Sequence, residues 1–479
     1  MERRIVGLDL GVATDHTAVM MDGGGGERGR RRVRPTRPSL EALLASALAG
    51  AAEGTVVEVV IEPTGPAWLP VAVFFSERGH RVYRVSSQRA ADLRKYFRRH
   101  HKTNRIDAAT LARMALLDGD ALQPVELRRG AMAALDREVR VTERLTREIS
   151  SRVTRIRDLA RQLMPTVGQA LSTQLSRTDV AVLRGYGDPR ALVALGIDAL
   201  TEMVVDVSHN KYGRPKAAAF MEAAEEALEL YGDSDAVPFE ALAADLATEI
   251  TLLEALVAAR TAHQRQREDL YGEVDPGGLA RSVPGVGVQG GPVAVTRVVR
   301  PGRFPNADAF ASFTGLVPKA SETGETDHKA QAMTKAGDRT LRTMLYRAAD
   351  TARKEDPQLA RIYFIQMVER GANHTKALSV TATHLARRLW RTLERGTPYL
   401  VCDIDGHPVP KEHARRIIAE HWTVPDDVRQ RRRSKKVGKA PHNVPAGHSN
   451  NGARSASTRR PSPKAIFCPL PTWGQPRGT

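Results

Sequence analysis

Residues 5–11 read Ile-Val-Gly-Leu-Asp-Leu-Gly, an apolar run that carries a single carboxylate, Asp9. A second apolar run spans residues 17–21, and the two runs predict a β-hairpin with a longer loop between its strands. Residues 30–34 predict a third strand with a basic outer face. A carboxylate at the end of a strand, close to the turn at Gly11, lies at the open end of a sheet. Asp9 is therefore a candidate functional residue.

The chain then alternates between predicted helices and strands. Residues 39–52 have helical composition, with Ser39 as the N-cap. Residues 55–61 form a β-branched run that suits a strand buried on both faces. A helix, a strand at 81–85 and more helical sequence follow as far as residue 118. Hairpin strands followed by this alternation are the order of a ribonuclease-H-like α/β sheet, which we expect over residues 1–120.

Two more carboxylates complete a candidate metal site. Glu62 ends the strand at 55–61 and precedes a Pro-Thr-Gly turn. In a ribonuclease-H-like sheet the first and fourth strands are neighbours, so Asp9 and Glu62 come together, and two adjacent anions repel each other unless a cation lies between them. Asp107 and Asn104, three residues apart on one helix face, supply further oxygen ligands. Such ligands predict Mg²⁺ or Mn²⁺ and phosphodiester cleavage.

The charge of the chain predicts a polyanionic partner. The formal charge is +17, with 72 Lys and Arg against 55 Asp and Glu. No run of about 18 apolar residues and no signal-peptide core is present, so we expect nucleic acid rather than a membrane. Residues 428–479 hold twelve Lys and Arg and no Asp or Glu, so most of the charge lies in a tail that is predicted to be disordered. Beside the metal site, phosphate binding is predicted for Arg98, Arg99, Lys102 and Arg105.

Residues 121–272 are predicted to be a helical, coiled-coil-like region. Apolar residues recur at three- and four-residue steps from Leu135 to Leu163 and again from Leu242 to Val257. This periodicity is typical of long amphipathic or coiled-coil helices. The two helices would form an antiparallel pair, a dimerising coil, or a layer on the body of the protein. Residues 166–234, between them, are a mainly helical insertion without an assigned role.

A mainly helical third domain is predicted at residues 279–400. It opens with Pro-Gly-Val-Gly at 284–287. This motif resembles the hairpin of a helix-hairpin-helix, in which the backbone N–H groups of Gly285 and Gly287 would bind phosphate. An ordinary Pro-Gly turn is the alternative.

The same domain contains a loop, residues 319–325, with two hydroxyl side chains, Ser321 and Thr323. A hydroxyl in such a loop is a candidate nucleophile on phosphorus. Only two cysteines occur in the chain, which excludes a disulfide framework and fits a reducing cytoplasm.

Together these motifs resemble those of a known family, the DEDD transposases of bacterial insertion sequences (the IS110 family), which includes the Piv/MooV-type DNA invertases. The resemblance covers about residues 3–118 and 279–396. The motifs that carry it are GLDLG at 7–11, IEPTG at 61–65, KTNRIDA at 102–108, PGVG at 284–287, FTGLVP at 313–318, TKAGDR at 334–339 and LR at 341–342.

The resemblance implies a RuvC-like nuclease domain, a helical coiled-coil linker and a transposase domain with a nucleophilic serine. It further implies Mg²⁺ or Mn²⁺ at Asp9, Glu62 and Asp107, donor and target DNA, and a structured bridge RNA as guide. Homodimers that assemble into tetramers, in the cytoplasm and nucleoid of a prokaryote, are implied as well. The motif at 334–339 adds Lys335 and Arg339 as nucleic-acid-binding residues.

Two positions depart from the family pattern. Asn104 stands where the family has Asp, which leaves the predicted metal shell one charge short. Thr323, rather than Ser, precedes Gly324 in the nucleophile loop, and the nearest serine is Ser321. The register favours Thr323 and the lower steric hindrance favours Ser321, so both remain candidates.

We therefore predict a transposase or site-specific recombinase that cuts and rejoins DNA strands, against three alternatives. The motif at 7–11, with Thr14 and Thr17, also resembles the first phosphate loop of actin-like sugar kinases and chaperone ATPases, but no convincing second phosphate loop follows. A RuvC-like nuclease that cuts without rejoining has no use for the hydroxyl loop. An inactive, nucleic-acid-binding relic of a transposase would explain Asn104 but not the three intact carboxylates.

Overall fold

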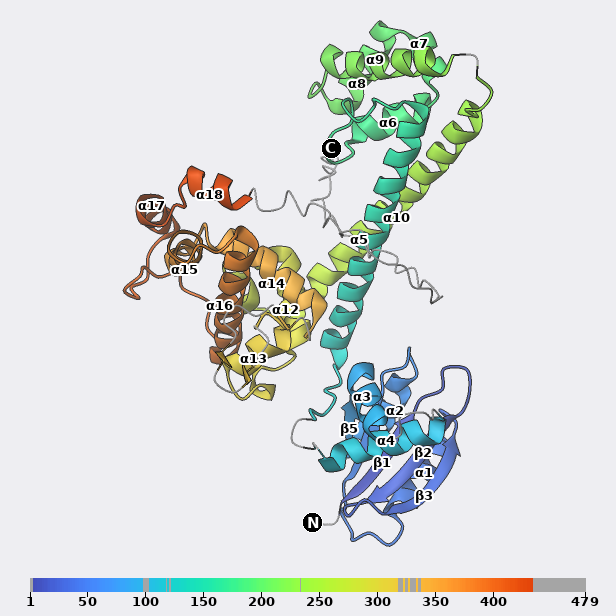
Figure 1. Cartoon of the computed structure of the whole chain (residues 1–479), viewed down its shortest axis with the longest axis vertical. Helices are drawn as coiled ribbons and strands as arrows, with labels where there is room; N and C mark the ends of the chain where they lie inside the picture. The colour runs from blue at the N-terminus through green and yellow to red at the C-terminus, as the bar shows by residue number, and fades with distance from the viewer. Residues whose placement is uncertain are drawn as a thin grey trace, which may run out of the picture. The chain divides into compact units, whose positions relative to one another are not determined.

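A computed structural model of the chain describes residues 3–97, 103–117, 119, 122–232, 234–317, 322–323, 326–327, 333–334 and 337–433. The chain divides into two compact units, Met1–Arg129 and Gly130–Thr479 (Figure 1). Among the described residues, no helix is both long and apolar enough to span a membrane.

The first unit is built on a five-stranded sheet in the order β3-β2-β1-β4-β5. The first three strands are antiparallel neighbours, whereas β4 and β5 continue the sheet in parallel with β1. This confirms the predicted hairpin, the third strand and the adjacency of the first and fourth strands. The strands are β1 (Arg4–Asp9), β2 (His16–Asp22), β3 (Glu27–Val33), β4 (Val57–Ile61) and β5 (Arg81–Arg84).

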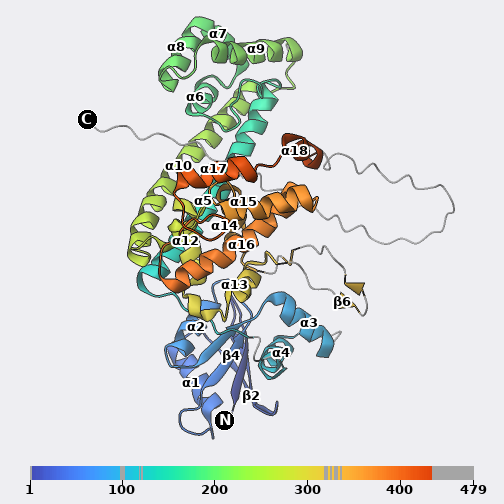
Figure 2. The same cartoon turned by 90° about the vertical axis from the view of Figure 1, so that its left-hand side faces the viewer.

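Helices cover both faces of this sheet (Figure 2). One face and the helices α1 (Arg37–Leu48) and α2 (Trp68–Ser76) enclose one apolar core. The opposite face and the helices α3 (Ser87–Phe97) and α4 (Asn104–Leu117) enclose a second. Helices on both faces of a mixed sheet with this strand order are consistent with the predicted ribonuclease-H-like fold.

The predicted start of the first helix was wrong. Thr36 is the N-cap of α1, and Pro38 lies in the first turn, where its missing N–H costs no hydrogen bond. The Ser39 hydroxyl instead accepts a hydrogen bond of 3.0 Å from the backbone N–H of Arg34. Ser39 therefore ties the helix to the end of β3 rather than capping it.

The second unit is organised around two long helices, α5 (Gly130–Leu163) and α10 (Phe239–Val274), which lie side by side. Ile149 and Ile156 of α5 share one core with Leu246 and Ile250 of α10. Their apolar faces are thus covered within the chain. The insertion between them folds onto the same core as α6 (Arg177–Tyr186), α7 (Pro189–Leu195), α8 (Ile197–Ser208) and α9 (Arg214–Tyr231).

Most of the helices that follow α10 share a further core. Helices such as α14 (Arg339–Ala352) and α16 (His374–Arg395) agree with the mainly helical domain predicted at residues 279–400, and α18 (Asp426–Arg433) covers the first residues of the tail that was predicted to be disordered. The rest of the tail, residues 434–479, lies outside the described residues. The elements are α11 (Leu279–Ser282), α12 (Gly287–Val298), η2 (Pro301–Arg303), α13 (Ala307–Thr314), β6 (Glu322–Thr323), β7 (Thr326–Asp327), α14 (Arg339–Ala352), α15 (Pro357–Phe364), η3 (Ile365–Glu369), α16 (His374–Arg395), α17 (Lys411–His421) and α18 (Asp426–Arg433).

Candidate active site at the end of the N-terminal sheet

Asp9 and Glu62 occupy neighbouring positions on one face of the sheet. β1 and β4 are parallel, with Leu8 opposite Ile61, so the next residue of each segment is Asp9 or Glu62. Leu8 and Ile61 both pack in the core beneath α1 and α2. Because side chains alternate between the two faces of a strand, Asp9 and Glu62 face the other side, which α4 covers. Both are half-buried.

Helix α4 carries Asp107 to the same end of the sheet. A Cβ atom on Gly7 would overlap the carbonyl oxygen of Ala108, so α4 rests directly on the backbone of β1. The guanidinium of Arg3 donates to the carbonyl of Ala115 at 2.9 Å, so the helix runs antiparallel to the strand. Its first turn, which holds the half-buried Asp107, therefore lies toward the end of β1 that carries Asp9.

The loop that follows Asp9 is held by a buried histidine. The backbone N–H of Gly11 donates to Nδ1 of His16 at 3.2 Å. Burial lowers the pKa of His16 below its ordinary value of 6.5, so the imidazole stays neutral at physiological pH and Nδ1 remains an acceptor. This hydrogen bond closes the turn between β1 and β2.

A basic groove of about 540 Å³ opens beside the acidic positions. Arg32 of β3 lies opposite Thr17 of β2, which in turn lies opposite Asp9 of β1. Directly opposite residues share a face of the sheet, so Arg32 and Arg30 lie on the same face as Asp9. Both arginines are exposed, and neither has an ion-pair partner within the described part of the chain. They are available to bind phosphate.

The start of α4 forms the other wall of this groove. Asn104 and Arg105 line it, and both are exposed. Arg105 also pairs with Glu27 of β3 at 3.4 Å. Asn104 thus borders the groove rather than being buried with the carboxylates. The other predicted phosphate-binding residues of this region, Arg98, Arg99 and Lys102, lie outside the described residues.

The acidic positions do not form an assembled metal shell in this structure. No three His, Cys, Asp or Glu side chains are gathered closely enough to hold an ion, as far as the described residues extend. Asp9 and Glu62 are adjacent positions on one face of the sheet, and Asp107 lies in the first turn of the helix that covers this face. All three offer oxygen donors of the kind that Mg²⁺ and Mn²⁺ prefer.

In the second unit, the candidate nucleophile loop includes a small hairpin. β6 and β7 pair antiparallel, with Thr323 opposite Thr326. Thr323 is the last residue of β6. Ser321 and Lys335 lie outside the described residues.

The two glycines of the 284–287 motif have different surroundings. Gly285 has a φ of +78°, and a Cβ there would overlap the carbonyl oxygen of Ala348 in α14. Close packing against α14 therefore accounts for this glycine. Gly287 is exposed and has open space around it. Arg339, the first residue of α14, is exposed as well.

One set of cationic side chains does not follow from the apolar periodicity of the sequence. Four arginines on α5, and Arg339 beyond them, line a second basic groove within the second unit. The spacing of these four arginines itself has the helical period, and this signal could have identified the charged face. The four are Arg137, Arg140, Arg144 and Arg147.

Comparisons with known proteins match transposases over both an N-terminal and a C-terminal part of the chain. Residues 6–165 match a family model described as a DEDD transposase of the IS110 type, and residues 278–363 match one described as "Transposase IS116/IS110/IS902 family". The chain is 29% identical to an uncharacterized 43.6 kDa protein of insertion element IS110 from Streptomyces coelicolor, over 72% of this chain and 84% of that protein. It is 25% identical to an uncharacterized 44.8 kDa protein of insertion element IS116 from Streptomyces clavuligerus, over 82% of this chain and 95% of that protein.

The sheet, its acidic end and the basic grooves are consistent with a nucleic-acid-processing protein that has a ribonuclease-H-like unit. The two family models together match just over half of the chain, in the order that the motifs predict. The protein belongs to the IS110/IS116 family of insertion-element transposases. This membership implies DNA as a partner and divalent metal in the reaction, and it removes the ATPase alternative.

Proposed function

We propose that this transposase cuts and rejoins DNA strands, using divalent metal at Asp9, Glu62 and Asp107 and a hydroxyl nucleophile from the second unit. One observation carries the proposal: two strand-end carboxylates share a sheet face with Arg30 and Arg32, which have no ion-pair partner among the described residues. Carboxylates attract a divalent cation and guanidinium groups bind phosphate. This combination suits a phosphodiester substrate.

The residues fit a hard metal ion. Asp9, Glu62 and Asp107 offer only carboxylate oxygens, and Asn104 at the groove edge adds a neutral amide oxygen. When bound, Mg²⁺ or Mn²⁺ would stabilise the negative charge that develops on the phosphoryl group. With Asn104 in place of a carboxylate, the site attracts the ion less strongly, so we expect a requirement for higher metal concentrations.

The protein's own groups perform the strand exchange. The hydroxyl oxygen of Thr323 or Ser321 attacks phosphorus, forms a new O–P bond, and loses its proton. The bond to the leaving DNA oxygen breaks, and that oxygen is protonated. The hydroxyl of a second DNA end then attacks the protein-linked phosphate and releases the side chain. One P–O bond forms for each that breaks, so no energy-rich cofactor is consumed.

Family resemblance extends this proposal to the partners. We propose a structured bridge RNA that pairs with donor and target DNA, and homodimers that assemble into tetramers. We further propose a division of roles between a nuclease domain at residues 1–120, a helical region at 121–272, a transposase domain at 279–400 and the basic tail at 428–479. The expected place of action is the prokaryotic cytoplasm, on the nucleoid.

The test is a search for protein-linked DNA. The full chain would be incubated with Mg²⁺, DNA carrying both ends of its element, and the RNA transcribed from the element's flank. Wild type should form an adduct and a recombinant joint, whereas Asp9→Ala should form neither. Loss in Thr323→Ala but not in Ser321→Ala assigns the nucleophile to Thr323, and the reverse assigns it to Ser321. DNA cleavage without a protein–DNA adduct or a recombinant joint would instead favour a nuclease that does not rejoin strands. The absence of any cleavage would favour an inactive relic of a transposase.

A further inference from the structure

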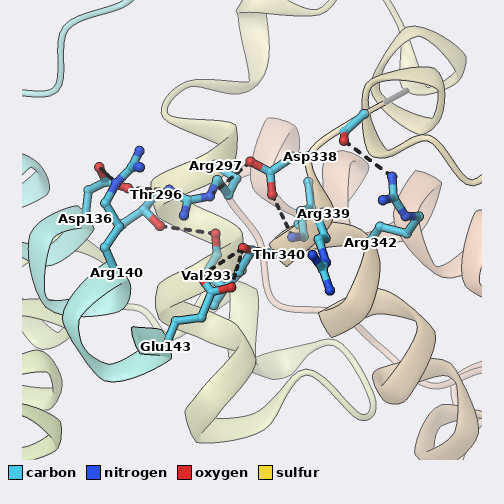
Figure 3. A network of polar contacts seen from close by, with 12 residues as sticks. Asp136, Arg140, Glu143, Val293, Thr296, Arg297, Asp338, Arg339, Thr340 and Arg342 are labelled. Carbon is cyan, nitrogen blue, oxygen red and sulfur yellow. Dashed lines mark hydrogen bonds and ion pairs between the residues drawn. The ribbon is translucent and has the colours of Figure 1, made fainter. Parts of the chain in front are cut away.

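The second unit contains a basic groove that the proposed chemistry does not use. It has a volume of about 450 Å³ and lies between α5, the end of α12 and the start of α14 (Figure 3). Its lining is polar, and arginines outnumber the two acidic residues, Glu143 and Asp338. The arginines are Arg137, Arg140, Arg144, Arg147, Arg297 and Arg339.

Four of the arginines form a stripe along α5. Arg137, Arg140, Arg144 and Arg147 follow one another at steps of three and four residues, so they lie on one face of the helix. All four are exposed. The stripe spans about 15 Å, at about 1.5 Å of rise per residue. A charged face of this kind is most often only solvated, so its surroundings decide its role.

The groove is held in shape by a buried arginine. Arg297 of α12 is only 5% exposed. It forms an ion pair with Asp136 of α5, and its Nε lies 3.2 Å from a carboxylate oxygen of Asp338, at the start of α14 (Figure 3). Asp136 also accepts a hydrogen bond of 2.9 Å from Arg140. One buried cation therefore fixes the arginine stripe relative to the first turn of α14.

The first turn of α14 has polar partners within the protein. The carboxylate of Asp338 accepts from the backbone N–H of Leu341 at 2.8 Å. The Thr340 hydroxyl donates toward the carboxylate of Glu143, at 3.0 and 3.1 Å to its two oxygens. Asp338 therefore caps this helix, and the helix terminus is not the feature that points to a ligand. Any ligand of the groove would be bound by the arginine side chains.

Three of these arginines have guanidinium groups that are available to bind a ligand. Arg137, Arg147 and Arg339 have no ion-pair partner within the described residues. Among the described residues, the one ion-pair contact of Arg144 is long, at 3.8 Å to Glu148. The groove presents a row of four guanidinium groups on α5, and the two at its ends, Arg137 and Arg147, have no ion-pair partner in the described part of the chain. Such a row suits a ligand with regularly repeated anions, because each planar guanidinium matches the geometry of a phosphate.

We propose that this arginine groove binds the phosphodiester backbone of a nucleic acid. Phosphates repeat at about 3.4 Å of axial rise per strand, so a stripe of about 15 Å faces several of them. We expect this binding to be independent of sequence, because contacts to phosphates carry no sequence information. The inference rests on the proposed function in one respect, namely that the substrate is a nucleic acid.

The test compares two triple variants of the full chain. The groove variant removes the three positive charges that have no ion-pair partner within the described residues, by the substitutions Arg137→Gln, Arg147→Gln and Arg339→Gln. Arg265→Gln, Arg391→Gln and Arg395→Gln remove three exposed arginines of the same unit that lie outside the groove. Affinity for a random-sequence DNA duplex and for a random-sequence single-stranded RNA would be measured against salt concentration.

The groove variant should bind at least one of these probes roughly tenfold or more weakly, with a salt slope smaller by about two to three. The control variant should lose clearly less affinity for the same probes. Lys at the three groove positions should restore most of the affinity. Whichever probe responds identifies the bound strand. Equal losses of affinity in both variants, or no loss in the groove variant, would show that the groove does not bind nucleic acid. If wild type binds and recombines DNA in that case, the proposed function still stands.

Discussion

Gly7 of β1 lies against the carbonyl oxygen of Ala108 in α4, with no space for a side chain between them. Strand and helix therefore meet backbone to backbone. The helix that carries Asp107 can approach the strand that carries Asp9 only because residue 7 is a glycine. The geometry of the acidic face thus depends on a residue that bears no functional group.

Gly7→Ala should impair both stability and catalysis. The added methyl group overlaps backbone atoms of α4, so the helix must move away from the sheet. Overpacking of this kind costs about 1–3 kcal/mol of unfolding free energy, which urea titration measures. Gly24→Ala is the matched control, because a Cβ there meets only the Asp22 carboxylate, at 3.5 Å. Equal stability of the two variants would contradict the close contact.

Asp9→Asn and Glu62→Gln should each abolish strand cleavage while leaving the fold intact. Both substitutions keep the size of the side chain and remove its charge. Loss of a metal ligand removes several kcal/mol of stabilisation, a decrease of roughly a thousandfold in rate. Cleavage assays and metal-dependent thermal shifts measure the effect. Glu53→Gln, at an exposed position of the same unit, should behave as wild type, and a cleavage-competent Asp9→Asn would exclude this residue from the site.

The first unit should lose stability on acidification. Nδ1 of His16 and of His80 accept the backbone N–H groups of Gly11 and Val57, at 3.2 and 3.3 Å. Burial lowers the pKa of both histidines below 6.5. As the pH falls through 6.5, the unfolded chain therefore binds protons before the folded chain, and the folded state loses free energy relative to it.

Urea titrations above and below pH 6.5 would measure this dependence. A variant with Gln at both positions should have a shallower decline of stability with pH. An unchanged decline would show that other groups cause it.

The buried ion pair of the second unit should be costly to break. Arg297 and Asp136 are only 5% and 8% exposed, so Asp136→Asn leaves a buried cation with one fewer counter-charge. The expected cost is about 3–5 kcal/mol of unfolding free energy. Arg140→Gln removes the exposed partner of the same carboxylate and should cost less than about 1 kcal/mol. Similar losses of unfolding free energy in the two variants would mean that burial does not determine the cost of breaking these ion pairs.

Deletion of residues 434–479 should separate non-specific binding from chemistry. The segment holds eight Lys and Arg and no acidic residue, and the deletion leaves α18 in place. Salt-sensitive, sequence-independent binding of DNA should fall more than the yield of recombinant joints. Parallel loss of binding and joints would assign the tail to the active assembly.

The sheet could be predicted because each of its signals is local. The apolar run that ends at Asp9 and the β-branched run before Glu62 each identify a strand, and strand order follows from the alternation with helices. The start of α1 could not be predicted in this way. Ser39 is a good capping residue, but Pro38 already suits the first turn and the Ser39 hydroxyl is used by Arg34. The composition of this segment does not reveal that the Ser39 hydroxyl binds the Arg34 N–H instead of capping the helix.

The candidate site was predictable in part for a similar reason. Asp9 and Glu62 follow recognisable strands, so their shared face follows from the fold. The contribution of Arg30 and Arg32 depends on the register of β3 against β2, which the sequence does not specify. The α5 groove depends on Arg297, whose partners are 161 residues upstream and 41 downstream in the chain. Such distant pairings appear only in three dimensions.

The paired helices α5 and α10 have a consequence for how this chain can vary. The helices between them share a core with one part of the pair, and Arg152 of α5 meets Glu249 of α10 at 2.6 Å, so the two connections to the insertion start from adjacent positions. The two family models stop before this insertion and resume after α10. We therefore expect that a reporter domain can replace the insertion between these two connections. Such a chain should keep both the acidic face and the arginine groove.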